Sequence, residues 1–359
     1  MRILILTNFD VGLYQFRKEL ISELLNNNEV FISLPYGKLV DKLQNMGCEF
    51  INTPLDRRGV NPLKDVKLIK QYKRIICKVN PDYVITYTIK PNIYGGYICG
   101  KLGIPYAVNI TGLGTAFQKR GFLRSIVTKL YKLGLKRAKV VFFENSGNKQ
   151  VFIDNGIVDI KQVCLLNGAG VNTAWYQFTP YPKDETPVRF LFIGRIMKEK
   201  GVEELFIAMR RVLNDGYNAQ LSMVGEFEEN YKKIIDKYQD EGWLKYYGYQ
   251  EDVRPYIEQS HCFVLPSWHE GMANTNLECA SMGRPVITSN IHGCKEAVDE
   301  GVTGFLCEKK NANDLYQKMK KLIALPNEER KAMGLAGRKR MEEYFDKKKV
   351  VSKTIENLF

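Results

Sequence analysis

Residues 262–283 have the sequence CFVLPSWHEGMANTNLECASMG, in which an apolar run, a loop and a helix-length segment follow one another. The run Cys262–Leu265 is typical of a buried strand, and Pro266 ends it. We expect the next helix to begin with Asn274 as its capping residue. The backbone N–H groups of residues 274–277 would then be free and point out of the helix start, where partial positive charge favours a phosphate.

Two glutamates bracket this helix start in a Glu-x7-Glu arrangement. Glu270 lies in the loop, and Glu278 lies about one turn inside the expected helix. Carboxylates accept hydrogen bonds from hydroxyl groups. The stretch is therefore expected to bind a molecule that carries both phosphate and hydroxyls, such as a sugar nucleotide.

The same alternation of strands and helices occurs twice along the chain. Strands are expected at residues 2–6, 30–34, 83–86 and 140–143 and, after a restart, at 188–194, 220–224, 262–265 and 285–288. Amphipathic stretches separate them, which predicts an α/β fold with doubly wound parallel sheets. A chain of 359 residues is long enough for two such domains. Residues 172–187 contain three prolines and no sustained period, so they are expected to form the linker.

The longer string EGMANTNLECASMGRPVITSNIHGCKEAVDEGVTGFLC, residues 270–307, resembles the retaining glycosyltransferases of family 4, which have the GT-B fold. The resemblance extends over most of the chain. It implies two Rossmann-like domains facing a central cleft, with an acceptor-binding domain at 1–171 and a nucleotide-sugar-binding domain at 188–340. It also implies that a C-terminal helix within 341–359 returns to the first domain.

A second loop, Gly194–Gly201 (GRIMKEKG), follows the strand expected to end near Ile193. It resembles the Gly-Arg…Lys-Gly motif of the same family, which implies that Arg195 and Lys200 clamp the donor diphosphate. Cations at this position neutralise the charge that develops as the nucleotide leaves. No metal ion or other cofactor is then expected, and the sequence contains no Asp-x-Asp pair.

The resemblance assigns roles to both glutamates. Glu270 would hold donor sugar hydroxyls near the 3- and 4-positions and act in catalysis with Arg195 and Lys200, and Glu278 would hold the ribose. The residues expected at the donor are Gly12, Gly194, Arg195, Lys200, Glu270, Gly271, Met272, Ala273, Asn274, Thr275 and Glu278. Gly12 belongs to the first strand-to-helix turn, where an ordinary turn glycine is the alternative.

Candidates for the acceptor come from loops of the first domain. Lys90, in the string YTIKPNIYGG, is a candidate contact for an acceptor phosphate or the sugar, and a solvated lysine is the alternative. Thr111 and Gly112, in NITGLG, are expected in a loop at the edge of the cleft.

All three histidines of the chain, His261, His269 and His292, lie in its C-terminal half. No imidazole of the first domain can therefore accept a proton. His269 is placed in the cleft region by its position beside Glu270, and a surface histidine is the alternative.

The net charge of +13 comes entirely from the N-terminal half. Residues 1–180 contain 25 lysines and arginines against 12 aspartates and glutamates, whereas residues 181–359 contain 28 of each class. A sugar-nucleotide site in the second domain does not need this excess, so a separate anionic partner is expected.

The richest basic segment, Lys119–Lys139, has eight basic residues and no acidic one. On a helix over 122–137, membrane-contact candidates Arg124, Lys129, Lys132 and Lys136 gather on one side, and Phe122, Leu123, Ile126, Val127, Leu130 and Leu133 on the other. Such a helix can lie in an anionic bilayer surface. The alternative is that its apolar side packs on the sheet and its basic side is solvated. A second basic series favours membrane contact: Arg57, Arg58, Lys64, Lys67, Lys70, Lys73, Arg74 and Lys78.

The strings YTIKPNIYGG, NITGLG and ENSGNKQVF resemble bacterial enzymes that build capsule, O-antigen or exopolysaccharide. The resemblance implies retaining transfer of a hexose or N-acetylhexosamine from a UDP-sugar to a polyprenyl-diphosphate-linked saccharide. Two alternatives are a non-hydrolysing UDP-sugar 2-epimerase of the same fold and a non-enzymatic basic protein that binds a membrane surface.

The cellular location is predicted from the N-terminal sequence and from the spacing of the cysteines. No signal peptide is recognised, because the apolar run after Arg2 ends at Leu6. No Cys-x-x-Cys pair occurs. We expect a cytoplasmic protein with reduced thiols, peripherally bound to the inner face of the cell membrane. Nothing resembles a nucleic-acid-binding motif.

Overall fold

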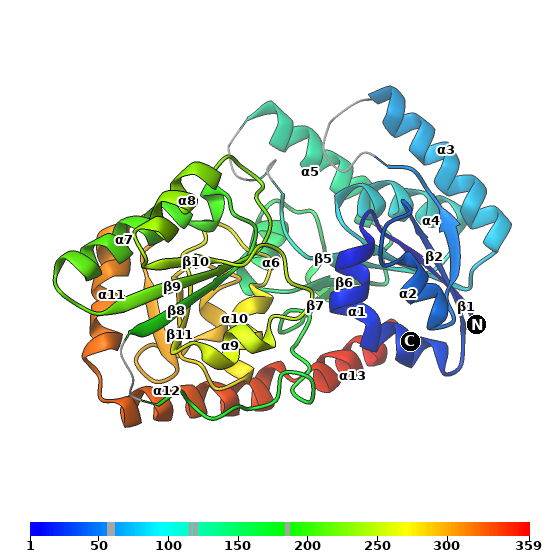
Figure 1. Cartoon of the computed structure of the whole chain (residues 1–359). Coiled ribbons are helices and arrows are strands. Elements are labelled where there is room, and N and C mark those ends of the chain that lie inside the picture. The colour runs from blue at the N-terminus through cyan, green and yellow to red at the C-terminus, as the bar shows by residue number, and fades with distance from the viewer. Residues whose placement is uncertain (56–61, 115–116, 118–120, 184–186) are drawn as a thin grey trace. The chain divides into compact units, whose positions relative to one another are not determined.

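The computed structural model describes residues 1–55, 62–114, 117, 121–183 and 187–359. The chain forms two compact units, each with its own parallel sheet (Figure 1). The first comprises Met1–Ala169 together with Lys348–Phe359, and the second comprises Gly170–Lys347. The prediction of two Rossmann-like α/β domains is confirmed.

The sheet of the first unit has seven strands in the order β3-β2-β1-β4-β5-β6-β7. All the recorded pairings are parallel, and the order reverses direction between β1 and β4, as in a doubly wound fold. The strands are β1 (Arg2–Leu6), β2 (Glu29–Leu34), β3 (Glu49–Asn52), β4 (Tyr83–Tyr87), β5 (Tyr106–Ile110), β6 (Val140–Phe143) and β7 (Val163–Leu165).

Helices cover both faces of this sheet because its central strands are apolar on both sides. Along β1, Leu4 and Leu6 enter one buried cluster and Ile3 and Ile5 enter the other, as the two-residue period of a strand requires. The helical segments are α1 (Asp10–Leu25), α2 (Val40–Asn45), α3 (Pro62–Val79), the π-helical turn η1 (Pro91–Gly95), α4 (Gly96–Leu102), α5 (Phe122–Leu135), α6 (Ser146–Asp154) and the 3-10 turn η3 (Ile160–Gln162).

The last helix, α13 (Lys347–Leu358), belongs to the first unit from Lys348 onward. Val350 and Leu358 are buried in the same cluster as Ile3 and Ile5. The Lys139 ammonium donates to the backbone carbonyl oxygen of Leu358 at 2.9 Å. Apolar burial and this hydrogen bond hold the C-terminal segment against the first sheet.

The second unit repeats the arrangement with six parallel strands in the order β10-β9-β8-β11-β12-β13. Its strands are β8 (Val188–Ile193), β9 (Ala219–Val224), β10 (Leu244–Tyr246), β11 (Cys262–Leu265), β12 (Val286–Ser289) and β13 (Gly304–Cys307). Its helical segments are η4 (Lys198–Lys200), α7 (Val202–Asn214), α8 (Lys232–Asp240), α9 (Arg254–Gln259), α10 (Asn274–Ser281), η5 (Lys295–Ala297), α11 (Ala312–Ala324), α12 (Asn327–Arg340) and η6 (Met341–Phe345).

The segment predicted as a linker, 172–187, is part of the second unit where the structure describes it. A fully buried guanidinium holds it there. Arg284 donates to the Thr179 hydroxyl at 2.8 Å and to the Pro180 carbonyl at 3.1 Å, and other N–H groups reach Ile257 and Glu258 carbonyls on α9. Desolvation lowers the pKa of Arg284 to about 10, so the charge depends on these acceptors.

Arg284→Met is expected to destabilise the protein by about 3–5 kcal/mol, because it leaves several buried carbonyls without a donor. Urea unfolding followed by circular dichroism would measure the loss. The control is Arg210→Met, at an exposed position of α7, where a change within about 0.5 kcal/mol is expected. Equal stabilities for the two variants would contradict this account of the buried arginine.

Candidate active site

The two loops singled out by sequence follow neighbouring strands at the centre of the second sheet. Gly194–Gly201 follows β8, and Pro266–Ala273 follows β11. The sheet order changes direction between these strands. The carboxyl ends of strands at such a switch point are the usual ligand site of doubly wound sheets.

A glycine allows the two loops to touch. Gly201 has a φ of +75°, and a Cβ built there would lie 2.1 Å from the Pro266 carbonyl oxygen. Any other residue would collide with rigid backbone as well as strain its own. The Trp268 N–H also donates to the Glu199 carbonyl at 2.8 Å. The loop after β8 is therefore docked on the loop after β11.

This docking brings Lys200 to Glu270. The Lys200 Nζ lies 2.5 Å from Glu270 Oε1, and the Ser267 hydroxyl donates to the same oxygen at 2.7 Å. The side chains of Lys200 and Glu270 are 19% and 12% exposed. Two residues that the sequence placed in one site thus form a largely buried, charge-assisted hydrogen bond.

Arg195 lies in the same loop but has a different partner. Its NH1 lies 3.4 Å from Glu228 Oε2, and its side chain is 51% exposed. An ion pair this exposed contributes little free energy, so the guanidinium can leave it for a ligand at low cost. Gly194 is packed against Gly225, where an added Cβ would lie 1.9 Å from the Gly194 carbonyl oxygen.

The prediction that Asn274 caps the helix is wrong. The helix α10 starts at Asn274 itself, Ala273 occupies the cap position, and no side chain makes a capping bond. The reason is tertiary: the Ala273 N–H donates to the Gly293 carbonyl at 2.7 Å, which holds Ala273 at the end of the loop, so the helix begins one residue earlier than predicted.

The expectation of four free N–H groups at this helix start is also wrong. The N–H groups of Asn274 and Asn276 donate to the carbonyls of Met272 and Ala273. Those of Thr275 and Leu277 make no such bond to a loop carbonyl in the described part of the chain. The helix start keeps its positive character with fewer available donors.

Gly293 was not anticipated from sequence, although it lies within the string that carries the resemblance. Its φ is +91°, and a Cβ there would lie 2.6 Å and 2.7 Å from the carbonyl oxygens of Glu270 and Gly271. Its N–H donates to the Glu296 carboxylate at 2.7 Å. The loop after β12 therefore supports the backbone that carries Glu270.

Glu278 lies one turn into α10 and has an unusual environment. Burial raises the pKa of Glu278 to about 7, and the nearby Tyr176 hydroxyl and the Lys347 charge oppose the rise. Part of the residue remains accessible to solvent. Near neutral pH the carboxyl is divided between its protonated and ionised forms.

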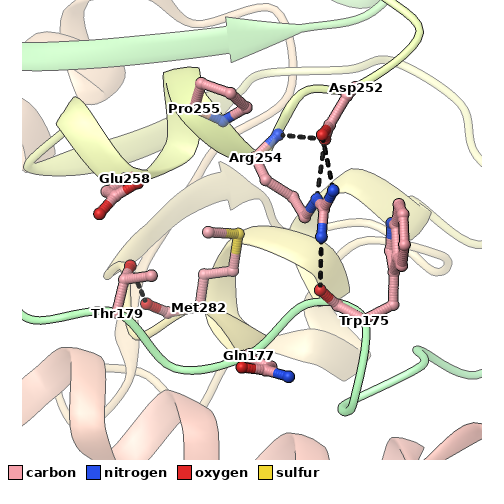
Figure 2. Close-up of a pocket in the computed structure, with 8 residues that line it drawn as sticks. All are labelled: Trp175, Gln177, Thr179, Asp252, Arg254, Pro255, Glu258 and Met282. Carbon is pink, nitrogen blue, oxygen red and sulfur yellow. Dashed lines mark hydrogen bonds and ion pairs between the residues drawn. The ribbon is translucent and has the colours of Figure 1, made fainter.

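A neighbouring hollow of about 340 Å³ lies on the second unit (Figure 2). One of its lining residues is Arg254, whose guanidinium carbon lies 3.7 Å from the Trp175 ring centroid. Arg254 also donates to both carboxylate oxygens of Asp252, at 2.9 Å and 2.7 Å. These hydrogen bonds lower the pKa of Asp252. Sequence reasoning did not single out this cluster.

The candidates of the first unit lie at the carboxyl ends of its strands. Lys90 follows β4, and Thr111 and Gly112 follow the adjacent β5. Lys90 pairs with Asp65 of α3 at 2.9 Å and is 15% exposed, so the alternative of a solvated lysine is wrong. Gly12 lies in the first turn of α1, which begins at Asp10, and not in a strand-to-helix turn.

The basic helix α5 only partly follows the predicted division into two sides. Val127 and Leu130 pack against the core, but Phe122, Leu123 and Leu133 are 83%, 44% and 58% exposed. The alternative of an apolar side packed on the sheet is therefore only partly right. Arg124, Lys129 and Lys132 line a hollow of about 350 Å³, whereas Lys136 lies outside it. Arg57 and Arg58 lie outside the described residues.

The three histidines have distinct surroundings. His261 is fully buried and burial lowers its pKa to about 4, and its Nδ1 accepts from the Arg189 N–H at 3.0 Å. Burial also lowers the pKa of His269. His292 lies 3.0 Å from the Glu296 carboxylate.

Within the described residues, no three or more His, Cys, Asp or Glu side chains are grouped so that they could hold a metal ion.

Glu278→Gln is expected to flatten the pH dependence of stability. Between the ordinary glutamate pKa of 4.5 and about 7, the folded protein binds more protons at Glu278 than the unfolded chain, so stability falls as pH rises through this range. At pH 8 the variant should be more stable than the parent by on the order of 1–3 kcal/mol, and the difference should shrink toward pH 5.

Urea unfolding at pH 5 and pH 8 would measure this difference. The control is Glu328→Gln on α12, whose side chain is 79% exposed and which should change neither value. A difference between parent and Glu278→Gln that does not depend on pH would contradict the assigned environment.

Comparison with known proteins identifies the family of this chain. Residues 175–340 match the family described as glycosyl transferases group 1, and residues 2–145 match the glycosyl transferase 4-like family. The capsular polysaccharide biosynthesis glycosyltransferase CapM of Staphylococcus aureus is 30% identical over 352 residues, 93% of this chain and 90% of CapM. The N,N'-diacetylbacillosaminyl-diphospho-undecaprenol alpha-1,3-N-acetylgalactosaminyltransferase of Campylobacter jejuni is 28% identical over 341 residues, 90% of this chain and 89% of that enzyme.

A solved structure extends the likeness to the whole fold. HepE of Anabaena, crystallised with UDP and glucose, has a TM-score of 0.82 at 15% identity, over 100% of this chain and 99% of that one. The expected GT-B fold is confirmed. The N-terminal part of the chain thus matches the glycosyl transferase 4-like family, and the C-terminal part matches the glycosyl transferases group 1. The chain belongs to the family 4 glycosyltransferases and is a glycosyltransferase enzyme.

Proposed function

We propose that this protein transfers a hexose or N-acetylhexosamine from a UDP-sugar to a polyprenyl-diphosphate-linked saccharide, with retention of anomeric configuration. The reaction would serve the assembly of a bacterial surface polysaccharide or glycan. The observation that carries the proposal is the contact of Lys200 with Glu270 at the carboxyl ends of β8 and β11, directly before the start of α10.

The donor diphosphate would be held by cations that are already close to where it must bind. Lys200 would exchange part of its contact with Glu270 for a phosphate oxygen. Arg195 would leave Glu228, an exchange favoured by the exposure of that pair. Together with the start of α10, they would stabilise the charge that develops on the leaving diphosphate. The leaving oxygen would accept the proton of the acceptor hydroxyl on the same face of the sugar.

Both glutamates would bind hydroxyl groups. Glu270 would bind the donor sugar, and Ser267 and Lys200 fix the orientation of its carboxylate. Glu278 would bind the ribose. Because the two residues come from the loop and from the helix that follows it, they can contact the two ends of one sugar nucleotide. The Gly271–Thr275 backbone lies between them and would border the donor.

The proposed mechanism uses no metal ion, since Arg195 and Lys200 would supply the positive charge that a metal would otherwise provide. Turnover in excess EDTA tests this point, and a loss that Mg²⁺ or Mn²⁺ restores would contradict it.

The acceptor class is supported by two features. The Campylobacter relative is named for an undecaprenyl-diphosphate-linked substrate, and residues 1–180 carry the whole charge excess of this chain. Lys90, Thr111 and Gly112 would border the acceptor saccharide. The basic helix α5 would contact anionic lipid at the inner face of the cell membrane, with Phe122 and Leu123 inserted among the headgroups. No helix within the described residues has the length and apolar character to cross a bilayer.

Lys200→Ala is expected to reduce the stabilisation of the transition state by about 2–4 kcal/mol, because it removes a charge beside the leaving group. The rate should then fall by roughly 30- to 1,000-fold. The measurement is UDP release from a panel of UDP-sugars with a lipid-linked acceptor, together with UDP binding by calorimetry.

The matched control is Lys198→Ala, in the same loop, whose ammonium pairs with Glu203 and whose side chain is 53% exposed. It should keep at least a third of the activity. Equal losses in the two variants would contradict the assignment of Lys200. Conversion of the UDP-sugar without an acceptor would instead indicate the epimerase.

Membrane contact is tested by flotation with anionic and neutral vesicles at low salt. Each basic residue at an anionic surface contributes about 1 kcal/mol, so Lys129→Ala with Lys132→Ala should weaken binding about 30-fold. The control pair is Lys232→Ala with Lys237→Ala on α8, for which no change is expected. Parent protein that stays unbound with anionic vesicles would overturn this part of the proposal.

A further inference from the structure

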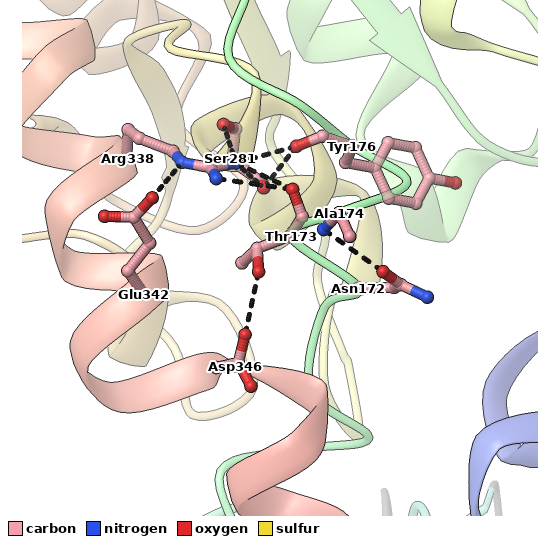
Figure 3. Close-up of polar contacts among 8 residues, drawn as sticks. All are labelled: Asn172, Thr173, Ala174, Tyr176, Ser281, Arg338, Glu342 and Asp346. Atoms are coloured by element: carbon pink, nitrogen blue, oxygen red, sulfur yellow. Dashed lines mark hydrogen bonds and ion pairs between the residues drawn. The ribbon is translucent and has the colours of Figure 1, made fainter.

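The helix that carries Glu278, α10, is held at its far end by an arginine of α12 (Figure 3). Ser281 ends α10, and its carbonyl oxygen accepts from Arg338 NH1 at 2.9 Å. The Tyr176 carbonyl accepts from the Ser281 hydroxyl at 2.7 Å and from Arg338 NH1 at 2.8 Å. The Arg338 side chain is only 17% exposed, and its planar guanidinium orients these acceptors together. The end of α10 is therefore fixed on α12.

The start of α10 has a different support, which comes from the loop after β12. The Ala273 N–H, directly before the helix, donates to the Gly293 carbonyl at 2.7 Å. Gly293 also approaches the carbonyl oxygens of Glu270 and Gly271 so closely that no side chain would fit there. The backbone from Glu270 to Ala273 thus rests on Gly293.

Glu296 in turn holds Gly293. Its Oε2 accepts from the Gly293 N–H at 2.7 Å, its Oε1 lies 3.0 Å from His292 Nδ1, and its side chain is 22% exposed. The Glu296 carbonyl accepts from Arg340 NH2 at 2.9 Å. Arg338 and Arg340 both belong to the last turn of α12. This turn is therefore tied directly to the end of α10 and, through Glu296 and Gly293, to its start.

A glycine in this position needs an external restraint. The φ of Gly293 is +91°, and glycine moves among backbone conformations more freely than any other residue. A bond from its N–H to a charged carboxylate is stronger than one to a neutral acceptor. Without the Glu296 carboxylate, the Gly293 peptide would be free to rotate. The carbonyl that holds Ala273 would then move, and the backbone at Glu270 with it.

The two glutamates of the donor site therefore depend on different contacts. The Glu270 carboxylate is oriented by Lys200 and Ser267, but its backbone rests on Gly293. Glu278 lies within α10, whose far end is fixed independently of Glu296. A change at Glu296 should reach the group that binds the sugar more than the group that binds the ribose.

We propose that Glu296 is a positioning residue for the donor sugar: its carboxylate fixes Gly293, which sets the place of Glu270 relative to the sugar hydroxyls. The inference rests on the proposed function, in which Glu270 binds the donor sugar near its 3- and 4-positions. It gives a residue outside the Glu-x7-Glu element and outside the Gly194–Gly201 loop a part in sugar recognition.

The test measures how strongly the protein depends on those hydroxyls. UDP-glucose, UDP-galactose, UDP-N-acetylglucosamine and UDP-N-acetylgalactosamine are each offered with a lipid-linked acceptor. The donor with the highest turnover is then compared, in binding by calorimetry, with its 3-deoxy and 4-deoxy analogues and with UDP. The parent should bind the donor roughly 10- to 150-fold more tightly than the analogue that lacks a hydroxyl held by Glu270. This ratio is the sugar preference.

Glu296→Ala should lower the sugar preference by roughly 5- to 10-fold and reduce kcat, because a small displacement of Glu270 weakens its contacts. The Kd of UDP should stay within about 2-fold of the parent value. Glu296→Gln keeps an oxygen that can accept from the Gly293 N–H, so it should retain most of the preference. Glu270→Gln should lose the preference, and adding Glu296→Ala to it should lower it no further.

Two further variants guard against a general loss of structure. Asp82→Ala removes a matched bond, from the Arg2 N–H to a carboxylate at 2.7 Å, at the amino ends of β1 and β4, and should leave preference and turnover unchanged. His292→Ala frees one oxygen of Glu296 and should lower the preference by a smaller factor. It serves as the test if Glu296→Ala does not fold.

The outcomes separate the inference from the proposed function. If Glu270→Gln loses the preference but Glu296→Ala keeps it, or weakens donor, analogues and UDP equally, Glu296 is structural and the inference alone is overturned. If the parent binds the donor and both deoxy analogues equally, Glu270 does not hold these hydroxyls, and the inference falls with that assignment. If the parent turns over none of the four UDP-sugars, the proposed donor class fails, and the inference fails with it.

Discussion

The close approach of Gly201 to the Pro266 carbonyl is the contact on which the site depends. It joins the loop after β8 to the loop after β11 at backbone distance, which no side chain would permit. Lys200 precedes this glycine and Glu270 follows Pro266, so the contact sets the separation of the two charges. Gly293 supports the same loop from the side of β12 by a second close approach to carbonyl oxygens.

The two cations of this site are each paired with a carboxylate. Lys200 is compensated by Glu270, and Arg195 by Glu228. Both pairs are formed from cations that a diphosphate would attract, but they differ in burial, and the buried pair is the costlier one to disturb. In the proposed mechanism, Lys200 is therefore the cation whose position is fixed before the donor binds. Arg195 is the cation that would have to move, and its exposure allows this.

Much of the fold and part of the site could be predicted from local patterns. The strands at 2–6, 140–143 and 262–265 were predicted with the bounds that the structure has, because buried parallel strands are continuous apolar runs. The proximity of Lys200 and Glu270 was implied by the resemblance of their two loops to motifs of the family. The predicted cap at Asn274 was wrong because a hydrogen bond from the Ala273 N–H to the Gly293 carbonyl, distant in sequence, helps to fix where α10 begins.

Sequence by itself determined the two-domain α/β architecture, the family and the location of the basic charge, since period, motif and composition are properties of the linear chain. Only the tertiary structure decided which charges are paired, which part of α5 is exposed, and that the Tyr176 carbonyl accepts a hydrogen bond from Ser281 of α10. These features depend on contacts between segments far apart in the chain, and on the burial that such contacts produce. Burial changes the pKa of a carboxylate or a lysine and limits which partners it can reach, and no local sequence pattern encodes burial.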